Sequence, residues 1–339
     1  MDELQMGGSR IDGPGMGGPG TGEPGTGGPG MEQKRLFWVR GVIAFAAAMA
    51  ALIFIGAPLQ FAFGIWGLLL SELILLAVAV AAALVIKLDF KQMLRIKAPR
   101  AGQILGIIIM AISGMAIGSC ATYIMLLILP QAEQTLEAFA ELYSSAPGLV
   151  TWLIVAVSPA ICEEVLHRGV ILNTFERSGF KGKWPIVLCM GLIFGIFHLD
   201  SLRFFATAIL GMILAYVMLE TKNFLLPVLY HMLNNSLSVL AGLLQPIDTA
   251  NITESLDMAA DLTLSTIGTV MIMAAFALLG LRLGARLLGP KESSLSVEEA
   301  AKLTANRKKT RALTAVASIL LFVAGVVCVS IQTAQMLAA

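Results

Sequence analysis

Long runs of uncharged, mostly apolar residues recur along most of this chain of 339 residues. Several of them reach the roughly 20 residues that cross the hydrocarbon core of a bilayer as an α-helix. Hydrophobic residues make up 57% of the chain and charged residues 13%, about half the charged share of an average soluble domain. A single soluble core cannot bury so much apolar surface. The sequence therefore predicts an all-α, polytopic transmembrane helical bundle.

We expect nine membrane spans. The uncharged stretch from Gly41 to Ser71 is too long for one helix, so we expect Gly56-Ala57-Pro58, together with Gln60, to divide it. The predicted spans cover 37–57, 64–86, 104–129, 149–175, 184–199, 203–220, 223–244, 262–282 and 312–336. Ser296-Val297-Glu298-Glu299 has the pattern of a capping box and predicts a short surface helix before the last span.

Composition divides the chain into four regions. Residues 1–33 are rich in glycine and proline and have nothing apolar to bury, so they are predicted to form a disordered cytoplasmic tail. N-terminal transmembrane helices occupy 34–148, and a core with unusual polar residues occupies 149–244. C-terminal transmembrane helices with a basic cytoplasmic loop occupy 245–339.

The loops between predicted spans alternate in charge. The basic ones hold Lys34, Arg35, Arg40, Lys87, Lys91, Arg95, Lys97, Arg100, Arg177, Lys181, Lys183 and the cluster between 282 and 311. The acidic ones hold Glu133, Glu137, Glu141, Asp248, Glu254, Asp257 and Asp261. The positive-inside rule then predicts a cytoplasmic N-terminus. The membrane is expected to be the cell membrane if the host is prokaryotic. The chain has 23 basic and 22 acidic residues, so it lacks the excess of positive charge that is typical of nucleic-acid-binding proteins. The expected partner is the lipid bilayer and not nucleic acid.

Three formal charges fall within six positions of the predicted span 149–175. An ionisable side chain at mid-membrane costs roughly 2.5–3.5 kcal/mol, so such residues are functional candidates. Glu164 and Arg168 are four residues apart, the spacing at which a carboxylate and a guanidinium meet on one helical face. Glu163 is rotated by about 100° from Glu164. We therefore expect Glu164 and Arg168 to form a structural pair and Glu163 to remain free for chemistry.

The chain contains only three histidines, and all lie in predicted spans. His231 shares a helical face with Asn235 at a four-residue spacing, and His167 lies four residues from Glu163, within reach of it. His198 lies near the outer end of a short span. We therefore expect that span to be tilted, displaced or longer at its inner end, so that His198 reaches the level of Glu163.

A carboxylate, two imidazoles and a carboxamide that face one cavity are suited to hydrolysis. The carboxylate, helped by an imidazole, takes a proton from water, while a histidine and an asparagine donate to the oxyanion that forms on an attacked carbonyl. The structural alternative is that each group only holds helices together by hydrogen bonds. Glu72 is placed near the outer interface, where we expect its carboxylate to extend toward water.

Three short motifs follow one another in the central spans: EExxxR at 163–168, FxxxH at 194–198 and HxxxN at 231–235. Each is weak alone, but their order and separation resemble the CPBP intramembrane protease family. That family includes the type II CAAX prenyl endopeptidases and bacteriocin-immunity membrane proteins. The resemblance covers about 150–244, under a third of the chain, and identifies 149–244 as a CPBP-like protease core.

The resemblance implies a role for each motif residue. Glu163 and His198 would activate the attacking water, His231 and Asn235 would stabilise the oxyanion, and two further residues, Glu164 and Arg168, would orient the site. We expect His167 and Phe194 to pack behind these groups and support them. His167 departs from the family pattern, which usually has an aromatic residue at this position.

The function that the resemblance implies is hydrolysis of a peptide bond in a membrane-anchored protein or peptide, including a CAAX-type prenylated one. Zinc held by Glu163, His198 and His231 is an open alternative, but a buried Glu–His pair can polarise water unaided, so we favour no metal and no other cofactor. Two other functions stay open. One is a non-catalytic immunity or scaffold protein with the same fold. The other is a transporter, which is disfavoured because the motif helices show no inverted repeat.

Overall fold

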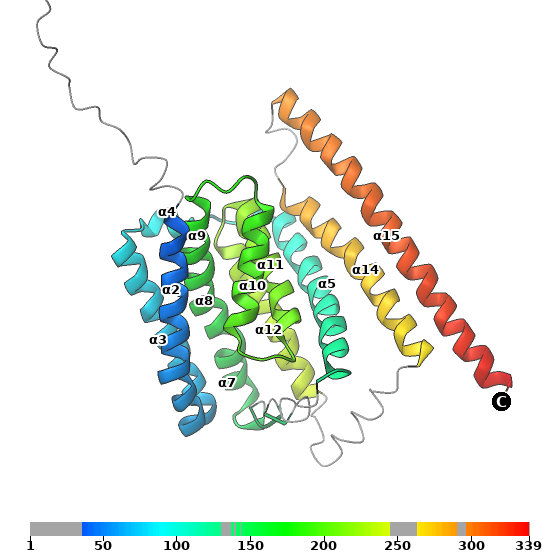
Figure 1. The fold of residues 1–339 in the computed structure, drawn as a ribbon, viewed down its shortest axis with the longest axis horizontal. Helices are drawn as coiled ribbons and strands as arrows, with labels where there is room; N and C mark the ends of the chain where they lie inside the picture. Colours follow the sequence, from blue (N-terminus) through cyan, green and yellow to red (C-terminus); the bar gives the residue numbers. More distant parts are fainter. Residues whose placement is uncertain are drawn as a thin grey trace, which may run out of the picture.

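The computed structural model describes residues 36–129, 137–138, 140–142, 144–244, 263–289 and 296–338. The predicted tail (1–33) and the acidic residues at 248–261 lie outside these ranges. Within them the regular structure is helical and contains no β-strand, which confirms the all-α prediction. Figure 1 shows a bundle of roughly aligned helices with one long helix along its side.

Six helical stretches of the described chain are long and apolar enough to cross a membrane. They are Phe37–Ile86, Ala101–Leu126, Gly148–Glu176, Phe204–Thr221, Leu264–Leu288 and Arg307–Ala338. The number is below the predicted nine for three reasons. The first stretch contains two of the predicted spans, α10 (Trp184–Phe197) is short, and α12 (Leu225–Leu244) carries the polar residues of the HxxxN motif. The chain is a multi-pass membrane protein, as expected.

The first two spans form a helical hairpin that reverses at Gly64. The chain runs through α2 (Phe37–Ala51), η1 (Leu52–Gly56) and α3 (Ala57–Ile86) in helical geometry, except at Gly64, where φ is 54° and ψ is −127°. Glycine alone adopts this backbone conformation without strain. The predicted break at Gly56-Ala57-Pro58 and Gln60 is therefore wrong in position, because proline is tolerated in the first turn of α3.

Polar contacts close this hairpin. Ser71 Oγ lies 3.1 Å from the carbonyl oxygen of Gly56 and 2.8 Å from that of Gly67, and it accepts a hydrogen bond from Gln60 Nε2 at 3.1 Å. Because Gly56 and Ser71 are on opposite arms, these bonds fix the two arms against each other. They also hold Gln60 in one place beside α3.

The central helix is continuous from Gly148 to Glu176. Its parts are α7 (Gly148–Trp152), η2 (Leu153–Val157), α8 (Ser158–Glu164), η3 (Val165–Ile171) and α9 (Leu172–Glu176), of which η2 and η3 are π-helical. In its most apolar window 56% of the residues are buried, against 11% for the last stretch, Arg307–Ala338. The helix with the EExxxR motif therefore lies at the centre of the bundle (Figure 1).

The helices with the other two motifs surround the central one. α10 packs closely on α11 (Phe204–Thr221), and a Cβ added at Gly211 would lie 2.5 Å from the Cβ of Phe194. α12 packs on α11 and on α5 (Ala101–Leu126), where Tyr230 Oη donates to the Met110 carbonyl at 3.1 Å. These contacts bring three motifs that are distant in sequence to one level.

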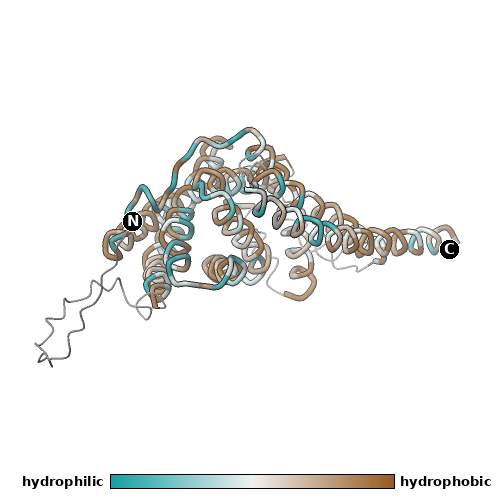
Figure 2. The backbone as a smooth tube through the Cα atoms, turned by 90° about the horizontal axis from the view of Figure 1, so that it is seen from above, coloured by the Kyte–Doolittle hydropathy of each residue, from teal (hydrophilic) through white to brown (hydrophobic). Residues whose placement is uncertain are grey.

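The C-terminal helices lie outside this core. α14 (Leu264–Leu288) packs on α5, and α15 (Val297–Ala338) packs on α14, which places α15 at the edge of the molecule (Figure 1). α15 begins next to Ser296, as the capping pattern predicts, but it continues without a break into the last span. The expected short surface helix is therefore the first part of one helix of 42 residues. Apolar residues dominate the helices (Figure 2).

Several residues of the predicted basic loops meet at one end of the bundle. Glu176, at the end of α9, accepts Arg95 Nη2 at 3.1 Å and also binds Lys222. Arg95 ends α4 (Phe90–Leu94), and Lys222 ends α11. The ion pairs therefore join segments from three parts of the chain at a common level. That this end faces the cytoplasm, with the N-terminus, stays a prediction.

Candidate active site

Glu163 lies at the end of α8 and faces a cavity between helices. Its side chain is buried, and its Oε2 accepts no hydrogen bond from the described part of the chain. The cavity has a volume of about 140 Å³ and is lined by Ala48, Ala51, Leu52, Gln60, Leu68, Ser71, Glu72, Ile74, Leu75, Glu163, Phe197 and His198. Glu163 is thus the motif carboxylate left free for chemistry, in the position that the helix geometry predicts.

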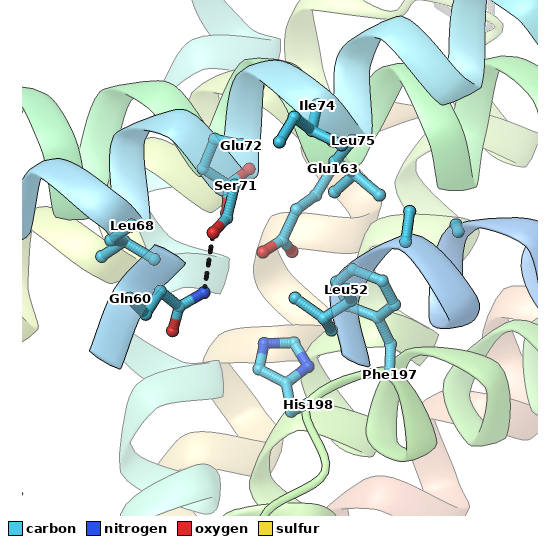
Figure 3. A pocket seen from close by; sticks show the side chains of 12 residues that line it. Leu52, Gln60, Leu68, Ser71, Glu72, Ile74, Leu75, Glu163, Phe197 and His198 are labelled. Carbon is cyan, nitrogen blue, oxygen red and sulfur yellow. Dashed lines mark hydrogen bonds between the residues drawn. The ribbon is translucent and has the colours of Figure 1, made fainter. Parts of the chain in front are cut away.

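His198 lines the same cavity from a different helix. It lies directly after Phe197, the last residue of α10, and its ring faces the space into which Glu163 projects (Figure 3). Its Nδ1 is 2.8 Å from the carbonyl oxygen of Phe194. Because a carbonyl only accepts, Nδ1 carries the proton, and Nε2 of the neutral ring is left as an acceptor. α10 begins at Trp184, where the predicted span begins, so His198 reaches the cavity without an extension at the inner end of this helix.

Glu164 is fully buried on the other side of α8. Its Oε1 accepts Arg168 Nη1 at 2.7 Å, and His231 Nδ1 lies 3.0 Å from the same oxygen. Arg168 also donates through Nη2 to the Gly211 carbonyl at 3.0 Å. The predicted pairing of Glu164 with Arg168 is present, and it extends to α11 and α12.

His231 lies between the two glutamates. Because its Nδ1 donates to Glu164, its orientation is fixed, and its Nε2 is directed to Glu163, 4.0 Å from Oε2. The ring is 2% exposed. With Nδ1 donating to Glu164, Nε2 of the neutral ring is an acceptor, and only the imidazolium form donates through Nε2 toward the space next to Glu163, where an oxyanion would need a donor.

Asn235 is engaged with the central helix. Its Nδ2 donates to the Val155 carbonyl at 3.2 Å, and its Oδ1 accepts Asn234 Nδ2 at 3.2 Å. Val155 lies in the π-helical segment η2. One hydrogen of the Asn235 amide remains for another acceptor, since the NH₂ group carries two. Asn235 is not among the residues that line the cavity.

His167 and Phe194 form an aromatic layer behind these groups. His167 is fully buried, and its Nδ1 contacts the backbone carbonyl of Glu163 at 2.8 Å, not its carboxylate. Phe194 has its ring 4.9 Å from that of His167, 4.8 Å from that of His198 and 5.7 Å from that of His231. Arg168 stacks over the same ring at 4.7 Å. Phe194 therefore sets the spacing between the polar groups.

Glu72 is the cavity residue that the sequence reasoning missed. We expected it near the outer interface with its carboxylate toward water, but it is 6% exposed, lines the cavity with Glu163, and its Oε2 has no hydrogen-bond partner in the described chain. The expectation is wrong because the hairpin turns at Gly64, which packs α3 against α8. No sequence motif marks the position; its only signal is an acidic residue inside an apolar span.

The described residues do not form a metal site as they are arranged. No group of three His, Cys, Asp or Glu side chains among them is placed to hold an ion. Of the candidate ligands, His231 already uses Nδ1 on Glu164, and its Nε2 is 4.0 Å from Glu163. Independence from metal stays a prediction.

Comparison with known proteins gives one match. Residues 145–237 match the family model of type II CAAX prenyl endopeptidase Rce1-like proteins. The curated proteins and the solved structures contain no significant match to the chain. The matched segment contains the EExxxR, FxxxH and HxxxN motifs, whereas three polar residues of the cavity lining, Gln60, Ser71 and Glu72, lie outside it. The central helices of this membrane protein thus match a CAAX-type intramembrane protease family, which confirms the resemblance to the CPBP family.

Proposed function

We propose that this protein is an intramembrane endopeptidase that hydrolyses a peptide bond of a membrane-associated protein or peptide. The observation that carries the proposal is that Glu163 and His198, from separate helices, line one cavity within the bundle. Each offers an acceptor there: Glu163 Oε2, which has no hydrogen-bond partner among the described residues, and Nε2 of the neutral His198 ring, whose Nδ1 is bound to the Phe194 carbonyl. A water molecule between two such acceptors donates to both, which directs its oxygen lone pair away from them.

In the proposed reaction, Glu163 removes a proton from this water as its oxygen attacks the carbonyl carbon of the substrate. The C–O bond forms, and the carbonyl π electrons move to its oxygen. His231, when its Nε2 is protonated, and the remaining amide hydrogen of Asn235 are the donors for this oxyanion. When the intermediate collapses, the C–N bond breaks, and the proton held by Glu163 goes to the nitrogen. The immediate products are a carboxylic acid and an amine, and the acid then passes its proton to the amine, which leaves a carboxylate and an ammonium.

The packing around Glu164 supports this mechanism indirectly. Glu164 fixes His231 through Nδ1, and Arg168 fixes Glu164. The imidazole therefore needs no reorganisation when charge develops, which is the main source of electrostatic catalysis. Since the cavity lies among apolar helices, we propose that the substrate reaches it from the bilayer as a membrane-anchored chain. A prenylated C-terminus is the substrate that the family name suggests.

The test is a cleavage assay with purified protein in lipid bicelles, using membrane-tethered peptides with and without a prenyl group, each with and without a chelator. Glu163→Gln and His198→Asn are expected to abolish cleavage. Glu220→Gln is the matched control, because Glu220 lies on α11, where it pairs with Lys183 and does not line the cavity.

The outcome separates the competing functions. Cleavage that both cavity variants retain would remove these residues from the mechanism. Binding of a partner protein that both variants retain, without any cleavage by the native protein, would favour the scaffold function. Loss of cleavage on addition of a chelator, restored by zinc, would overturn the prediction of a metal-free reaction.

A further inference from the structure

The cavity is rich in hydrogen-bond acceptors and poor in donors. Its polar lining consists of Gln60, Ser71, Glu72, Glu163 and His198, and no lysine or arginine is among its twelve lining residues. Two of the five are carboxylates. His198 uses its Nδ1–H on a backbone carbonyl, so this donor is not available to a ligand.

The hairpin of α2 and α3 supplies the part of this lining that the water-activating pair does not use. Gln60 donates through Nε2 to Ser71 Oγ at 3.1 Å, which leaves its carbonyl oxygen as the acceptor for a ligand (Figure 3). Ser71 lies 2.8 Å and 3.1 Å from two backbone carbonyls, so its hydroxyl hydrogen is also committed. The carbonyl oxygen of Gln60 is therefore held as an acceptor beside α3, and one of the two amide hydrogens is also left over.

Glu72 is the strongest feature of this wall. Glu72 is only 6% exposed, and it lines the cavity. Its Oε2 has no hydrogen-bond partner in the described chain. A buried carboxylate without donors is costly unless a proton or a cation compensates it. The proposed reaction uses Glu163 as base and gives Glu72 no role, so it does not say whether a proton or a bound cation compensates the Glu72 carboxylate.

We propose that Glu72 and the Gln60 carbonyl oxygen bind a primary ammonium group of the substrate. This inference rests on the proposed function and specifies its substrate class: a membrane-tethered peptide with a lysine side chain close to the scissile bond, or a substrate presented with an aminophospholipid headgroup. An ammonium has three N–H donors and no acceptor, which complements a wall made of acceptors. A ligand carboxylate would meet one donor on this wall, the second amide hydrogen of Gln60, and would also face the carboxylate of Glu72.

Other cations fit less well. A divalent metal ion needs several ligand side chains around one point, and the described residues offer no such group. A primary ammonium is compact and is carried on a flexible apolar stem that suits the leucines and alanines of the same wall.

The first experiment compares peptides that differ only by lysine or norleucine at each position around the scissile bond. At one position the native protein is expected to cleave the lysine peptide at least about tenfold faster in kcat/KM, since hydrogen bonds to charged groups contribute about 1.5–3 kcal/mol. In Glu72→Gln the ratio should fall to about one, while the norleucine peptide is cleaved within about threefold of the native rate. Gln60→Met, which keeps the length but removes the acceptor, should lower the ratio by a smaller factor.

A second experiment measures binding without catalysis. n-Butylammonium and n-butanol, which differ in charge but little in size, are titrated into the protein by ligand-observed NMR. Only the ammonium is expected to bind, and Glu72→Gln should abolish its binding, whereas Glu220→Gln should not. Because no peptide is cleaved here, ammonium binding by a protein that cleaves nothing would refute the proposed function and leave the ammonium site in place.

The outcomes identify the source of the ammonium. A lysine preference that is independent of lipid indicates the substrate side chain. Cleavage of the norleucine peptide that rises in phosphatidylethanolamine bicelles relative to phosphatidylcholine, and that Glu72→Gln removes, indicates the headgroup. Equal binding of butanol and butylammonium, or an unchanged lysine preference in a folded Glu72→Gln protein, overturns the proposal.

Discussion

The two sides of α8 carry similar polar groups in opposite states. On one side, Glu164 contacts both Arg168 and His231, and all three side chains are almost completely buried. On the other side, Glu163 and Glu72 each keep an oxygen that has no partner in the part of the chain that the structure describes, and His198 completes the wall of the cavity. Both sides bury carboxylates within the bundle, but in the described chain only the side with Glu164 supplies hydrogen bonds to its carboxylate from Arg168 and His231.

The difference shows how adjacent glutamates take separate roles. A buried charge with partners stabilises the arrangement of helices, and removing one partner leaves the other uncompensated. A buried charge without partners contributes nothing to that arrangement, and it is available to a water molecule or a substrate. The rotation of about 100° between adjacent helical residues is what separates the two roles.

The largest predicted effect tests this division directly. Glu163→Gln removes the base, so we expect turnover to fall by about 10²–10⁴-fold, the usual contribution of general base catalysis. Stability should be unchanged or higher, because the amide removes a buried charge that has no donors. Cleavage assays in bicelles measure the first quantity, and reversible unfolding in mixed detergent–SDS micelles measures the second. A Glu163→Gln protein that unfolds more easily would place Glu163 on the structural side instead.

The second prediction concerns the partnered side. Arg168→Met leaves Glu164 buried with only His231 as partner, so we expect a loss of about 3–5 kcal/mol in the free energy of unfolding. The double variant Glu164→Gln/Arg168→Met removes both charges and should recover a large part of this loss. The same micelle titration measures both. If the double variant is as unstable as the single one, the loss comes from packing, including the stacking of Arg168 on Phe194, and not from charge.

A third prediction concerns the backbone contact that joins the two sides. Gly211 accepts Arg168 through its carbonyl, and its Cα faces Phe194 at a distance that leaves no room for a methyl group. Gly211→Ala should therefore cost about 1–3 kcal/mol through overpacking and lower the cleavage rate, because Phe194 contacts the rings of His198 and His231. Gly118→Ala is the control, since its nearest neighbour would lie 3.7 Å from the added Cβ; an equal loss there would contradict this explanation.

The pairing of Glu164 with Arg168 and a shared cavity for Glu163 and His198 could be predicted from the sequence, whereas the partner of Asn235 and the place of Glu72 could not. The four-residue spacing of Glu164 and Arg168 follows from helix periodicity alone, and the structure has their contact at 2.7 Å. The partner of Asn235 is a Val155 carbonyl in a π-helical segment. Because regular periodicity gives no signal for such a segment, this contact could not be anticipated.

The position of Glu72 shows a second limit. Hydropathy places a residue along the membrane normal, but it does not say which face of the helix meets a neighbour. The turn at Gly64 decides that face, whereas the sequence analysis placed the break at Gly56-Ala57-Pro58 and Gln60. The α-helical fold and the existence of the spans follow from composition, whereas the wall of the cavity depends on one glycine of the hairpin.

The smallest predicted effect concerns an ion pair at the surface of the same helices. Lys183 and Glu220 join α10 to α11, but their side chains are 36% and 22% exposed. Water already solvates both groups, so the pair gains little from contact, and ordering two long side chains offsets part of that gain. Lys183→Ala should therefore change the free energy of unfolding by less than about 1 kcal/mol, and salt should reduce the difference further. Cleavage should be unchanged, because neither residue lines the cavity. A loss as large as that of Arg168→Met would mean that charge pairing stabilises this bundle irrespective of burial, and the contrast between the two sides of α8 would then have another cause.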